Sequence, residues 1–320
     1  MVRYLITGAA GFVGANLVRG LADKNNEVYA LIRKTNPWRI NDLLISGKVK
    51  GCYADLTNLE DLKKCIQSIK PDFIFHTAVY GAYPGRQKDI NLMIQTNIIG
   101  TINLIEAAEE IPIINTGSTS EYGIKEAPMK ETDLCLPDND YGWSKLSQTL
   151  YCQKKKIPTL RLFSVYGPWE DPNRLIPILT KAKINNSPLS LRNSVRDYIY
   201  SEDVVDAFIK ASEEYERIKG EIINIGSGKQ SSVKDILLII DNINTQRLKI
   251  NWDFKAIQTE PKVWVADIEK ANKLLNWKPR YTVEQGLKKT YEWQDKFIKN
   301  ENRVSTEEEC RDKRENNRLS

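Results

Sequence analysis

The first half of the chain alternates short apolar runs with longer segments whose apolar residues recur at helical spacing. Short apolar runs bounded by polar turns are typical of buried strands, and the longer segments are typical of helices. Alternation of this kind predicts a parallel sheet covered by helices on both faces, with ligands bound at the carboxyl ends of its strands. The predicted strands are Arg3–Thr7, Glu27–Ile32, Asp72–Thr77, Pro112–Thr116 and Thr159–Val165, and the predicted helices are Phe12–Lys24, Leu59–Ile69, Ile90–Glu110 and Trp143–Lys155.

The second half is less regular and predicts a smaller lobe that closes over the first unit. We expect a large unit at residues 1–165, the lobe at 166–300 with some interleaving, and a tail at 301–320. The tail is almost entirely charged or polar, which predicts disorder. Within the lobe the sequence predicts helices at Arg174–Asn185, from Ser201 onward, and at Val233–Asn244, Ala266–Leu275 and Val283–Lys299, with extended segments at Ser190–Tyr200 and Glu221–Ile225.

Composition narrows the class of protein. The 320 residues are 41% hydrophobic and 28% charged, which is ordinary for a soluble globular protein. The net charge of +5 comes partly from lysines 154–156, and no basic stripe with interleaved aromatic residues predicts a nucleic-acid partner. The aliphatic run Ile236–Ile240 is far too short to cross a bilayer, so we expect no membrane partner either.

The cysteines, the N-terminus and the histidine count limit the chemistry further. The five cysteines show neither Cys-x-x-Cys nor metal-ligand spacing, which favours a reducing compartment. The N-terminus enters a predicted strand at Arg3 and leaves no room for a signal peptide, so we expect a cytoplasmic protein. His76 is the only histidine, which excludes sites built on several histidines; we expect no metal, and an acid or base that is a Tyr, a Lys or a carboxylate.

Three glycines follow the first predicted strand and open a helix. Gly8, Gly11 and Gly14 have the spacing Gly-x-x-Gly-x-x-Gly, which allows a sharp turn and a close approach of the backbone to a pyrophosphate. The helix N-terminus adds amide donors and a positive dipole end. A plain tight turn is the alternative. At the end of the second predicted strand stands Arg33, where an acidic residue would hold the ribose of NAD, so a basic one favours NADP(H), with NAD(H) possible.

Tyr141 and Lys145 are four residues apart and therefore share a face of a predicted helix. A phenol beside an ammonium has a lowered pKa and can exchange protons near neutrality. Tyr151 with Lys155 and Tyr215 with Lys219 have the same spacing. Only the first pair follows a Ser-rich strand exit at 118–120 and precedes another apolar strand, so we interpret Tyr141 as the candidate proton donor.

Together these motifs resemble the extended short-chain dehydrogenase/reductases that act on nucleotide sugars. The resemblance covers roughly residues 1–297 and implies an α/β fold: a Rossmann-type doubly wound parallel sheet that binds NAD(P), with a smaller C-terminal α/β lobe for the nucleotide sugar. It also implies a homodimer. The matching segments are Thr7–Gly14, Asp55-Leu56, His76–Val79, Ser118–Gly123, Tyr141–Lys145, Arg161–Pro168, Arg196–Tyr200, Asn224–Gly228 and Leu275–Pro279.

The resemblance implies a role for each matching residue. Tyr141 resembles the catalytic acid/base, Lys145 the lysine that binds the nicotinamide ribose and lowers the pKa of the tyrosine, and Ser118 the residue that hydrogen-bonds the reacting sugar oxygen. Ser164 stands where many relatives have Asn, so the local substrate contact must differ. The other expected cofactor-binding residues are Gly8, Gly11, Phe12, Val13, Gly14, Arg33, Asp55, Leu56, Thr77, Ala78 and Val165, and the expected substrate-binding residues are Tyr80, Ser118, Thr119, Ser164, Arg174 and Arg196.

The reaction is open among related chemistries. Arg161–Trp169 followed by Asn173–Pro177 resembles the CDP-paratose and CDP-abequose synthases, which, together with Arg33, favours NADPH-dependent reduction of the 4-keto group of a nucleotide-linked deoxysugar in polysaccharide or deoxysugar biosynthesis. A 4-epimerase or 4,6-dehydratase with tightly held NAD(P) is the alternative. Dehydratases carry Asp and Glu where Thr119 and Ser120 stand, although the order Thr-Ser-Glu, ending here at Glu121, resembles that of GDP-mannose dehydratases. A non-catalytic NADP-binding sensor is a third possibility, against which the intact Tyr/Lys pair speaks.

Overall fold

The computed structural model describes residues 1–24, 26–33, 36–83, 89–253 and 261–316, with side chains described as far as residue 300. Its largest element is a parallel sheet of seven strands in the order β10-β6-β5-β4-β1-β2-β3. The order reverses between β1 and β4, and the crevice at such a switch point is where doubly wound folds bind ligands. The strands are β1 Arg3–Thr7, β2 Glu27–Ile32, β3 Lys50–Tyr53, β4 Phe73–His76, β5 Ile113–Ser118, β6 Thr159–Leu162 and β10 Ile222–Ile225.

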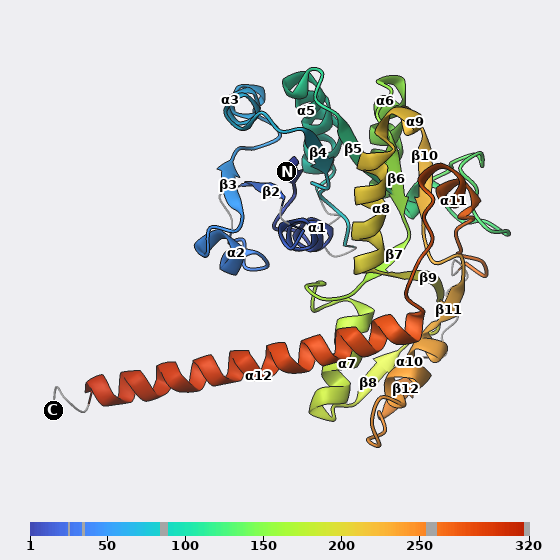
Figure 1. The fold of residues 1–320 in the computed structure, drawn as a ribbon. Helices are drawn as coiled ribbons and strands as arrows, with labels where there is room; N and C mark the ends of the chain where they lie inside the picture. Colours follow the sequence, from blue (N-terminus) through green and yellow to red (C-terminus); the bar gives the residue numbers. More distant parts are fainter. Residues whose placement is uncertain (25, 34–35, 84–88, 254–260, 317–320) are drawn as a thin grey trace.

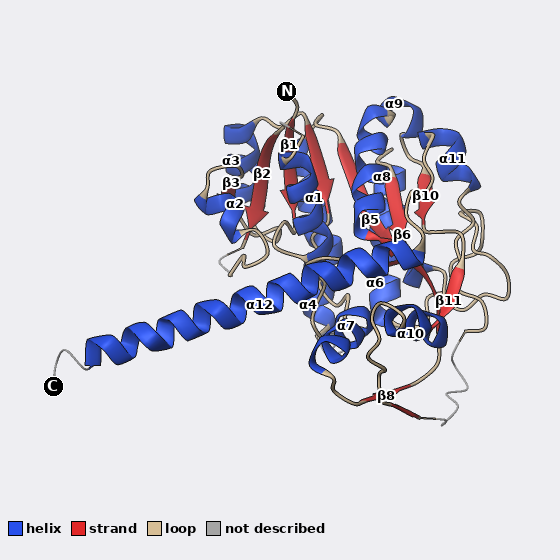
Figure 2. Cartoon of the chain, turned by 60° about the horizontal axis from the view of Figure 1, so that its bottom comes forward, coloured by secondary structure: helices blue, strands red, loops and turns tan. Residues whose placement is uncertain are grey.

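Helices cover both faces of this sheet, as the apolar strands require (Figure 2). Successive side chains of a strand point to opposite faces, so Leu5 packs in one layer and Ile6 in the other. The layer around Ile6 contains α1 Phe12–Ala22, α8 Ser201–Glu213 and α11 Glu269–Leu275. The layer around Leu5 contains α3 Leu59–Ile69 and α5 Gly100–Ala108, with Cys152 of α6 Asp140–Lys154. Short helices complete this unit: α2 Asn41–Ile45, α4 Ile90–Ile94, the π-helix η2 Gln95–Ile99, the 3-10 turn η3 Thr119–Glu121 and α9 Tyr215–Ile218.

A smaller unit lies beside the carboxyl ends of the strands (Figure 1). Its core includes Leu179, Ile236 and Leu287 from three different helices. The predicted division at residue 165 stays a prediction; in the structure, α8 and β10 return from the second half of the chain to the large sheet. The elements of the smaller unit are β7 Ser164–Tyr166, α7 Leu175–Asn185, β8 Leu189–Leu191, β9 Val195–Tyr200, β11 Gln230–Ser232, α10 Val233–Asp241, β12 Ile250–Trp252 and α12 Val283–Asn316.

The predicted extent of one strand was wrong. Thr159–Val165 was predicted as one strand, but it divides at Phe163 into β6 and β7, which belong to different sheets. The Val165 N–H donates to the Phe163 carbonyl at 2.7 Å, and this tight turn redirects the chain. The predicted disorder of the tail from residue 301 stays a prediction; α12 continues to Asn316 and runs away from the body (Figure 1). Residues 301–316 contain neither Gly nor Pro and are rich in Glu and Arg, which favour helix.

Cys52 on β3 and Cys65 on α3 form a disulfide, with their Cα atoms 6.5 Å apart. No spacing rule in the sequence indicated this pair, because the fold, and not a short motif, brings the strand and the helix together. It gives no support to the reducing compartment predicted from the cysteine pattern, and the cellular location stays a prediction. Among the described residues, no helix combines the length and apolar character needed to cross a bilayer.

Candidate active site

A cavity of about 850 Å³ opens at the carboxyl ends of the large sheet and extends toward the smaller unit. The loops after β1, β2, β3, β4, β5 and β6 all reach it, as expected for a parallel sheet. Every site residue predicted from the sequence lines it: Gly8, Gly11, Phe12, Val13, Gly14, Arg33, Asp55, Leu56, Thr77, Ala78, Tyr80, Ser118, Thr119, Tyr141, Lys145, Ser164, Val165, Arg174 and Arg196.

The glycine loop after β1 needs its glycines for both conformation and space. Gly8 has a φ of +66°, and a Cβ there would lie 2.6 Å from the backbone of Ala78. The Gly11 N–H donates to the Gly8 carbonyl at 2.8 Å, so the loop closes tightly before α1 begins at Phe12. No side chain caps the N-terminus of α1. Its backbone amides therefore face the cavity without side-chain cover, in the arrangement that binds an anionic diphosphate.

His76, the only histidine, is structural. Its Nδ1 lies 2.7 Å from Thr7 Oγ1 and its Nε2 lies 2.8 Å from Thr101 Oγ1, so the ring joins β1, β4 and α5. Burial, with a smaller contribution from the charge of Lys145, lowers the pKa of His76 to about 3. The ring is neutral at physiological pH and does not line the cavity.

Lys145 is buried and its ammonium is fixed by the sheet. Its Nζ donates to the Thr116 carbonyl of β5 at 2.6 Å and to Gln148 Oε1. Gln148 is held in turn by Asn115, since its Nε2 donates to Asn115 Oδ1 at 2.8 Å. Burial lowers the pKa of Lys145 to about 8, while the charge of Glu121 acts in the opposite direction. This arrangement presents a cation at a fixed point of the cavity wall.

The pKa of Tyr141 differs from the prediction. The sequence predicted a pKa lowered by Lys145, but burial raises the pKa of Tyr141 to about 12, and a hydrogen bond with Ser118 acts against that rise. The reason is that the ammonium of Lys145 is directed to Thr116 and Gln148. Tyr141 and Ser118 nevertheless line the same cavity, so the predicted pair of an acid/base and an orienting hydroxyl is brought together.

Burial of Lys145 predicts a pH-dependent stability. The folded pKa of about 8 lies below the ordinary value of 10.5, so the penalty for burying the ammonium is complete below pH 8. Between these values the folded protein releases a proton that the unfolded chain keeps, and stability rises with pH. We expect the free energy of unfolding of the wild type to rise from pH 8 to 10 relative to that of Lys145→Met, measured by denaturant titration. Lys155→Met, which removes an exposed lysine of α6, is the control; equal slopes for wild type and Lys145→Met would contradict the prediction.

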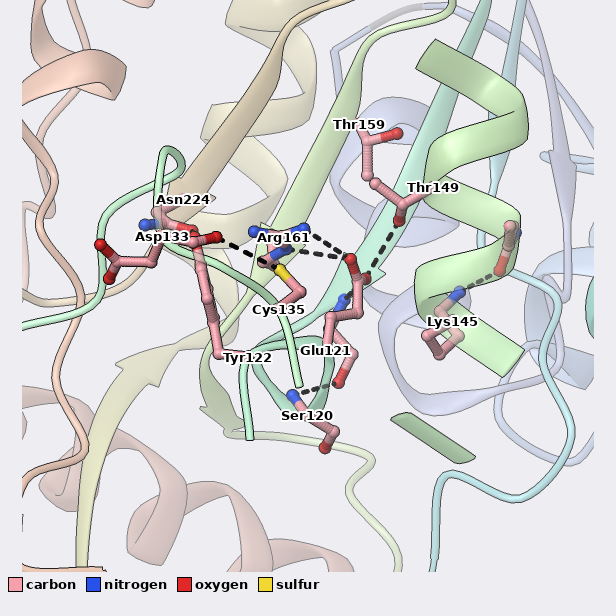
Figure 3. Close-up of polar contacts among 12 residues, drawn as sticks. Ser120, Glu121, Tyr122, Asp133, Cys135, Lys145, Thr149, Thr159, Arg161 and Asn224 are labelled. Carbon is pink, nitrogen blue, oxygen red and sulfur yellow. Dashed lines mark hydrogen bonds and ion pairs between the residues drawn. The ribbon is translucent and has the colours of Figure 1, made fainter. Parts of the chain in front are cut away.

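Glu121 does not line the cavity, and its carboxylate is directed to Arg161 and Thr149 (Figure 3). Its carboxylate accepts hydrogen bonds from the Ser118 N–H at 2.6 Å and from Thr149 Oγ1 at 3.1 Å. It also pairs with Arg161, whose Nη2 and Nε lie 2.7 and 3.0 Å from Oε2, and both side chains are at most 1% exposed. Glu121 therefore holds the strand exit that carries Ser118, and its side chain is not available to an acid/base step in the cavity.

The wall toward the smaller unit carries two arginines that stack on aromatic rings. The guanidinium of Arg174 lies 5.5 Å from the ring centre of Tyr83, and that of Arg196 lies 4.9 Å from the ring centre of Trp264. Both line the cavity and present planar donors suited to phosphate oxygens. Trp264 is buried in a small apolar cluster, and it also supports Arg196 at the cavity.

The sequence analysis missed further residues of the wall, among them Tyr83, Glu170 and Arg39. Arg39 donates to the Trp169 carbonyl at 2.7 Å and to the Ala10 carbonyl of the glycine loop at 3.3 Å. Behind it lies a cluster of aromatic rings, here called the aromatic wall. Tyr83 and Arg39 belong to no short motif, so their position in the fold was the only signal; Trp169 ends the matching segment Arg161–Trp169 and Glu170 follows it, but the segment did not single them out. The aromatic wall consists of Trp38, Trp169, Trp293 and Phe297.

Comparison with known proteins identifies the family. Residues 4–226 match the model of the NAD dependent epimerase/dehydratase family. The chain belongs to this family. A UDP-glucuronate 4-epimerase of Thermodesulfobacterium geofontis is 30% identical, over 92% of this chain and 97% of that protein. A dTDP-glucose 4,6-dehydratase of Salmonella typhimurium is 24% identical, over 91% of this chain and 92% of that protein.

A solved structure extends the similarity to three dimensions. The UDP-glucuronic acid 4-epimerase from Bacillus cereus in complex with UDP-glucuronic acid and NAD is 31% identical and superposes with a TM-score of 0.81, over 92% of this chain and 99% of that one. The family member described here thus has the predicted Rossmann-type fold. Within its described ranges, no group of three or more His, Cys, Asp or Glu side chains is placed to hold a metal ion.

Proposed function

We propose that this family member is a nucleotide-sugar 4-epimerase that retains a nicotinamide dinucleotide through the reaction. The observation that carries the proposal is the single cavity in which the glycine loop, Lys145, Tyr141 and Ser118 meet. The carboxylate of Glu121 is bound to Arg161 and does not line the cavity, which leaves the loop without the acid/base that a dehydration needs. Relatives about 30% identical over nearly the whole chain are UDP-glucuronate 4-epimerases, which supports a UDP-linked sugar. The reduction of a 4-keto sugar, favoured from the sequence, has no such support.

The residues of the cavity suit the dinucleotide. The space above Gly8 is closed to a Cβ, and the amides of the loop face a diphosphate; Arg33 and Asp55 lie at the ends of β2 and β3, where the adenosine half would lie. Lys145 of α6 would hold the nicotinamide ribose from the position that its hydrogen bond to Thr116 of β5 fixes. A bound nicotinamide would supply reversible hydride exchange with C4 of the sugar.

Side chains of the protein transfer the proton of the C4 hydroxyl and orient the sugar. Tyr141 removes the proton of the C4 hydroxyl as the C4–H bond breaks, and gives it back to the oxygen when the hydride returns to the other face. Ser118 hydrogen-bonds the same oxygen and stabilises its developing charge, and its backbone is fixed by Glu121. Arg174 and Arg196 bind the diphosphate of the substrate. The sugar can therefore rotate and present its other face to the nicotinamide while the nucleotide stays bound.

The test is direct. The purified protein, with whatever dinucleotide it retains identified by mass spectrometry, is incubated with UDP-glucose, UDP-galactose or UDP-glucuronate. The expected result is interconversion of C4 epimers, followed by nuclear magnetic resonance, with no net change in nicotinamide absorbance. Stoichiometric consumption of added NADPH with a 4-keto nucleotide sugar would establish the 4-ketoreductase instead. That second candidate is favoured by one observation, the basic Arg33 at the adenosine end of the cavity.

Arg33 also predicts the choice of dinucleotide. A guanidinium at the end of β2 suits a 2′-phosphate, so we infer a preference for NADP(H) over NAD(H). Arg33→Asp is expected to shift the ratio of the two dissociation constants toward NAD by about 10- to 100-fold, the value of one or two charge-assisted hydrogen bonds. Calorimetry on cofactor-free protein measures both constants. Lys48→Asp makes the same charge change at an exposed residue away from the cavity and should leave the ratio unaltered; an equal shift in both variants would contradict a specific contact.

The expected homodimer has a matching surface. Apolar side chains are exposed on the neighbouring elements α4, η2 and α6: Ile90 at 49%, Ile94 at 40%, Ile99 at 36%, Trp143 at 53% and Leu150 at 53%. We propose that a second copy of the chain covers this face, which includes the helix that carries Tyr141 and Lys145. Leu150→Glu should convert the protein to a monomer in light scattering, whereas Leu238→Glu, at an equally exposed leucine of α10, should not. A wild type that is monomeric at micromolar concentration would overturn the proposal.

A further inference from the structure

Glu170 lies on the cavity wall, and the reaction proposed above gives it no task. It follows Trp169 in the loop between β7 and α7, and its side chain is 5% exposed. The residue lines the main cavity and also a neighbouring cavity of about 660 Å³ on the side of the smaller unit. Ser164, Arg174 and Arg196 line both cavities as well, so Glu170 lies on the substrate side of the site.

Only one oxygen of this carboxyl group has a partner. Oε1 lies 3.6 Å from Nε of Arg174, while Oε2 has no hydrogen-bond partner among the described residues. An unsatisfied buried polar atom costs about 1–3 kcal/mol, and native structures tolerate few of them. Burial raises the pKa of Glu170 to about 8, with Arg174 acting against that rise. A polar group of a bound ligand is the partner that this oxygen lacks.

The surroundings of Glu170 connect it to the reacting end of the substrate. The ring of Tyr83 packs under Arg174, the residue that pairs with Glu170. Burial and then the charge of Glu170 raise the pKa of Tyr83, and Tyr83 and Arg174 both act on the pKa of Tyr141, whose main cause is burial. Glu170 is thus connected through Arg174 to Tyr83, and both Arg174 and Tyr83 act on the catalytic tyrosine.

We propose that Oε2 of Glu170 binds a hydroxyl of the substrate's hexose and thereby selects neutral nucleotide hexoses over nucleotide uronates. The inference rests on the proposed function and names its substrate class. A hydroxyl both donates and accepts, so it satisfies a carboxyl group in either protonation state. A uronate carboxylate only accepts, so it can pair with the protonated carboxyl group of Glu170 but is repelled by the ionised one. Glu170 therefore discriminates against uronates at a pH above its pKa of about 8.

The test compares kcat/KM for UDP-glucose and UDP-glucuronate in three proteins. The assay is run above the pKa of about 8, where the carboxyl group of Glu170 is ionised, and there the wild type is expected to favour UDP-glucose by about tenfold or more, the value of one such hydrogen bond. Glu170→Gln keeps a donor and an acceptor, so its kcat/KM for UDP-glucose should stay within about threefold while the preference over UDP-glucuronate falls about tenfold. Glu170→Ala should lower kcat/KM for UDP-glucose by about 10- to 100-fold, and recovery in the Gln variant separates recognition from a merely structural role.

Asp171→Asn is the matched control. It removes the same charge from the same loop, but its carboxylate already accepts hydrogen bonds from the Asn173 N–H at 3.0 Å and Nδ2 at 3.1 Å and does not line the main cavity. The ratio of kcat/KM for UDP-glucose to kcat/KM for UDP-glucuronate should be the same in Asp171→Asn as in the wild type. A wild type that prefers UDP-glucuronate, or Gln and Ala variants with an unchanged ratio, would overturn the role of Glu170 while leaving the epimerase intact.

Binding distinguishes the failure of this proposal from that of the reaction. The dissociation constants of UDP-glucose and UDP-glucuronate are measured by calorimetry in the same three proteins. Suppose that neither sugar is epimerised, but that the wild type binds UDP-glucose more tightly than UDP-glucuronate and the Glu170 variants lose this difference. The proposed epimerase reaction is then wrong, and the proposed selectivity of Glu170 stands. If neither nucleotide sugar binds, both are overturned.

Discussion

Replacing Tyr141 by phenylalanine is expected to lower the rate of C4 epimerisation by about 10²- to 10⁴-fold, the usual contribution of a positioned acid/base. The loss should appear in kcat with little change in KM, because the phenol acts on the reacting oxygen, whereas Arg174 and Arg196 hold the nucleotide. The variant should also keep its dinucleotide, since the glycine loop and Lys145 are unaltered. The measurement is the initial rate with the best substrate, together with mass spectrometry of the retained dinucleotide.

Tyr151→Phe provides a matched control for this experiment. Tyr151 has the same four-residue spacing to a lysine on the same helix, and the Nζ of Lys155 lies 5.8 Å from its ring centre. It does not line the cavity, so its replacement should leave kcat unaltered. An equal effect of the two variants would show that the loss comes from the stability of α6, and an active Tyr141→Phe would remove the phenol from the mechanism.

Glu121→Gln is expected to destabilise the protein by about 3–5 kcal/mol, because it leaves the buried guanidinium of Arg161 without its counter-charge. The amide still accepts from the Ser118 N–H, so the activity of each folded molecule should fall far less than in Tyr141→Phe. Denaturant unfolding measures the first effect, and the rate at a temperature well below the transition measures the second. Glu126→Gln, an exposed residue of the following loop, should change stability by no more than about 0.5 kcal/mol.

A double variant makes this prediction more specific. Glu121→Gln with Arg161→Met removes both charges, and since a buried pair is often neutral relative to apolar residues of similar size, part of the lost stability should return. The contrary outcome is a Glu121→Gln protein of wild-type stability with 10²-fold or lower activity, about the loss expected for an acid/base. That result would place Glu121 in the chemistry and restore the dehydratase.

Much of the large sheet and of the cavity followed from local sequence. β1, β2 and α3 have the predicted bounds, because each is an uninterrupted apolar or amphipathic run between polar turns. The glycine loop, Arg33, Ser118, Tyr141 and Lys145 all reach one cavity because parallel strands end at the same edge of their sheet. The order of strands and helices in a parallel sheet was therefore enough to predict that these functional residues lie together.

The rest depended on contacts between segments far apart in the chain. The turn at Phe163 separates β6 from β7 only because β10 pairs with one and β9 with the other. The distinction between a catalytic and a structural Glu121 rests on Arg161, and the raised pKa of Tyr141 rests on burial and on the partners of Lys145. Glu170 belongs to no motif, and only the folded chain shows that one of its oxygens lacks a partner.

The aromatic wall bears on the order in which a growing chain is completed. Trp293 and Phe297 of α12 pack on Trp169, and Phe297 also packs on Trp38. Arg39 then connects this wall to the Ala10 carbonyl of the glycine loop. On the ribosome the glycine loop therefore emerges well before the rings of α12 that support its outer side. The dinucleotide pocket is completed only after α12 has been made, although residues 8–14 precede that helix by most of the described chain.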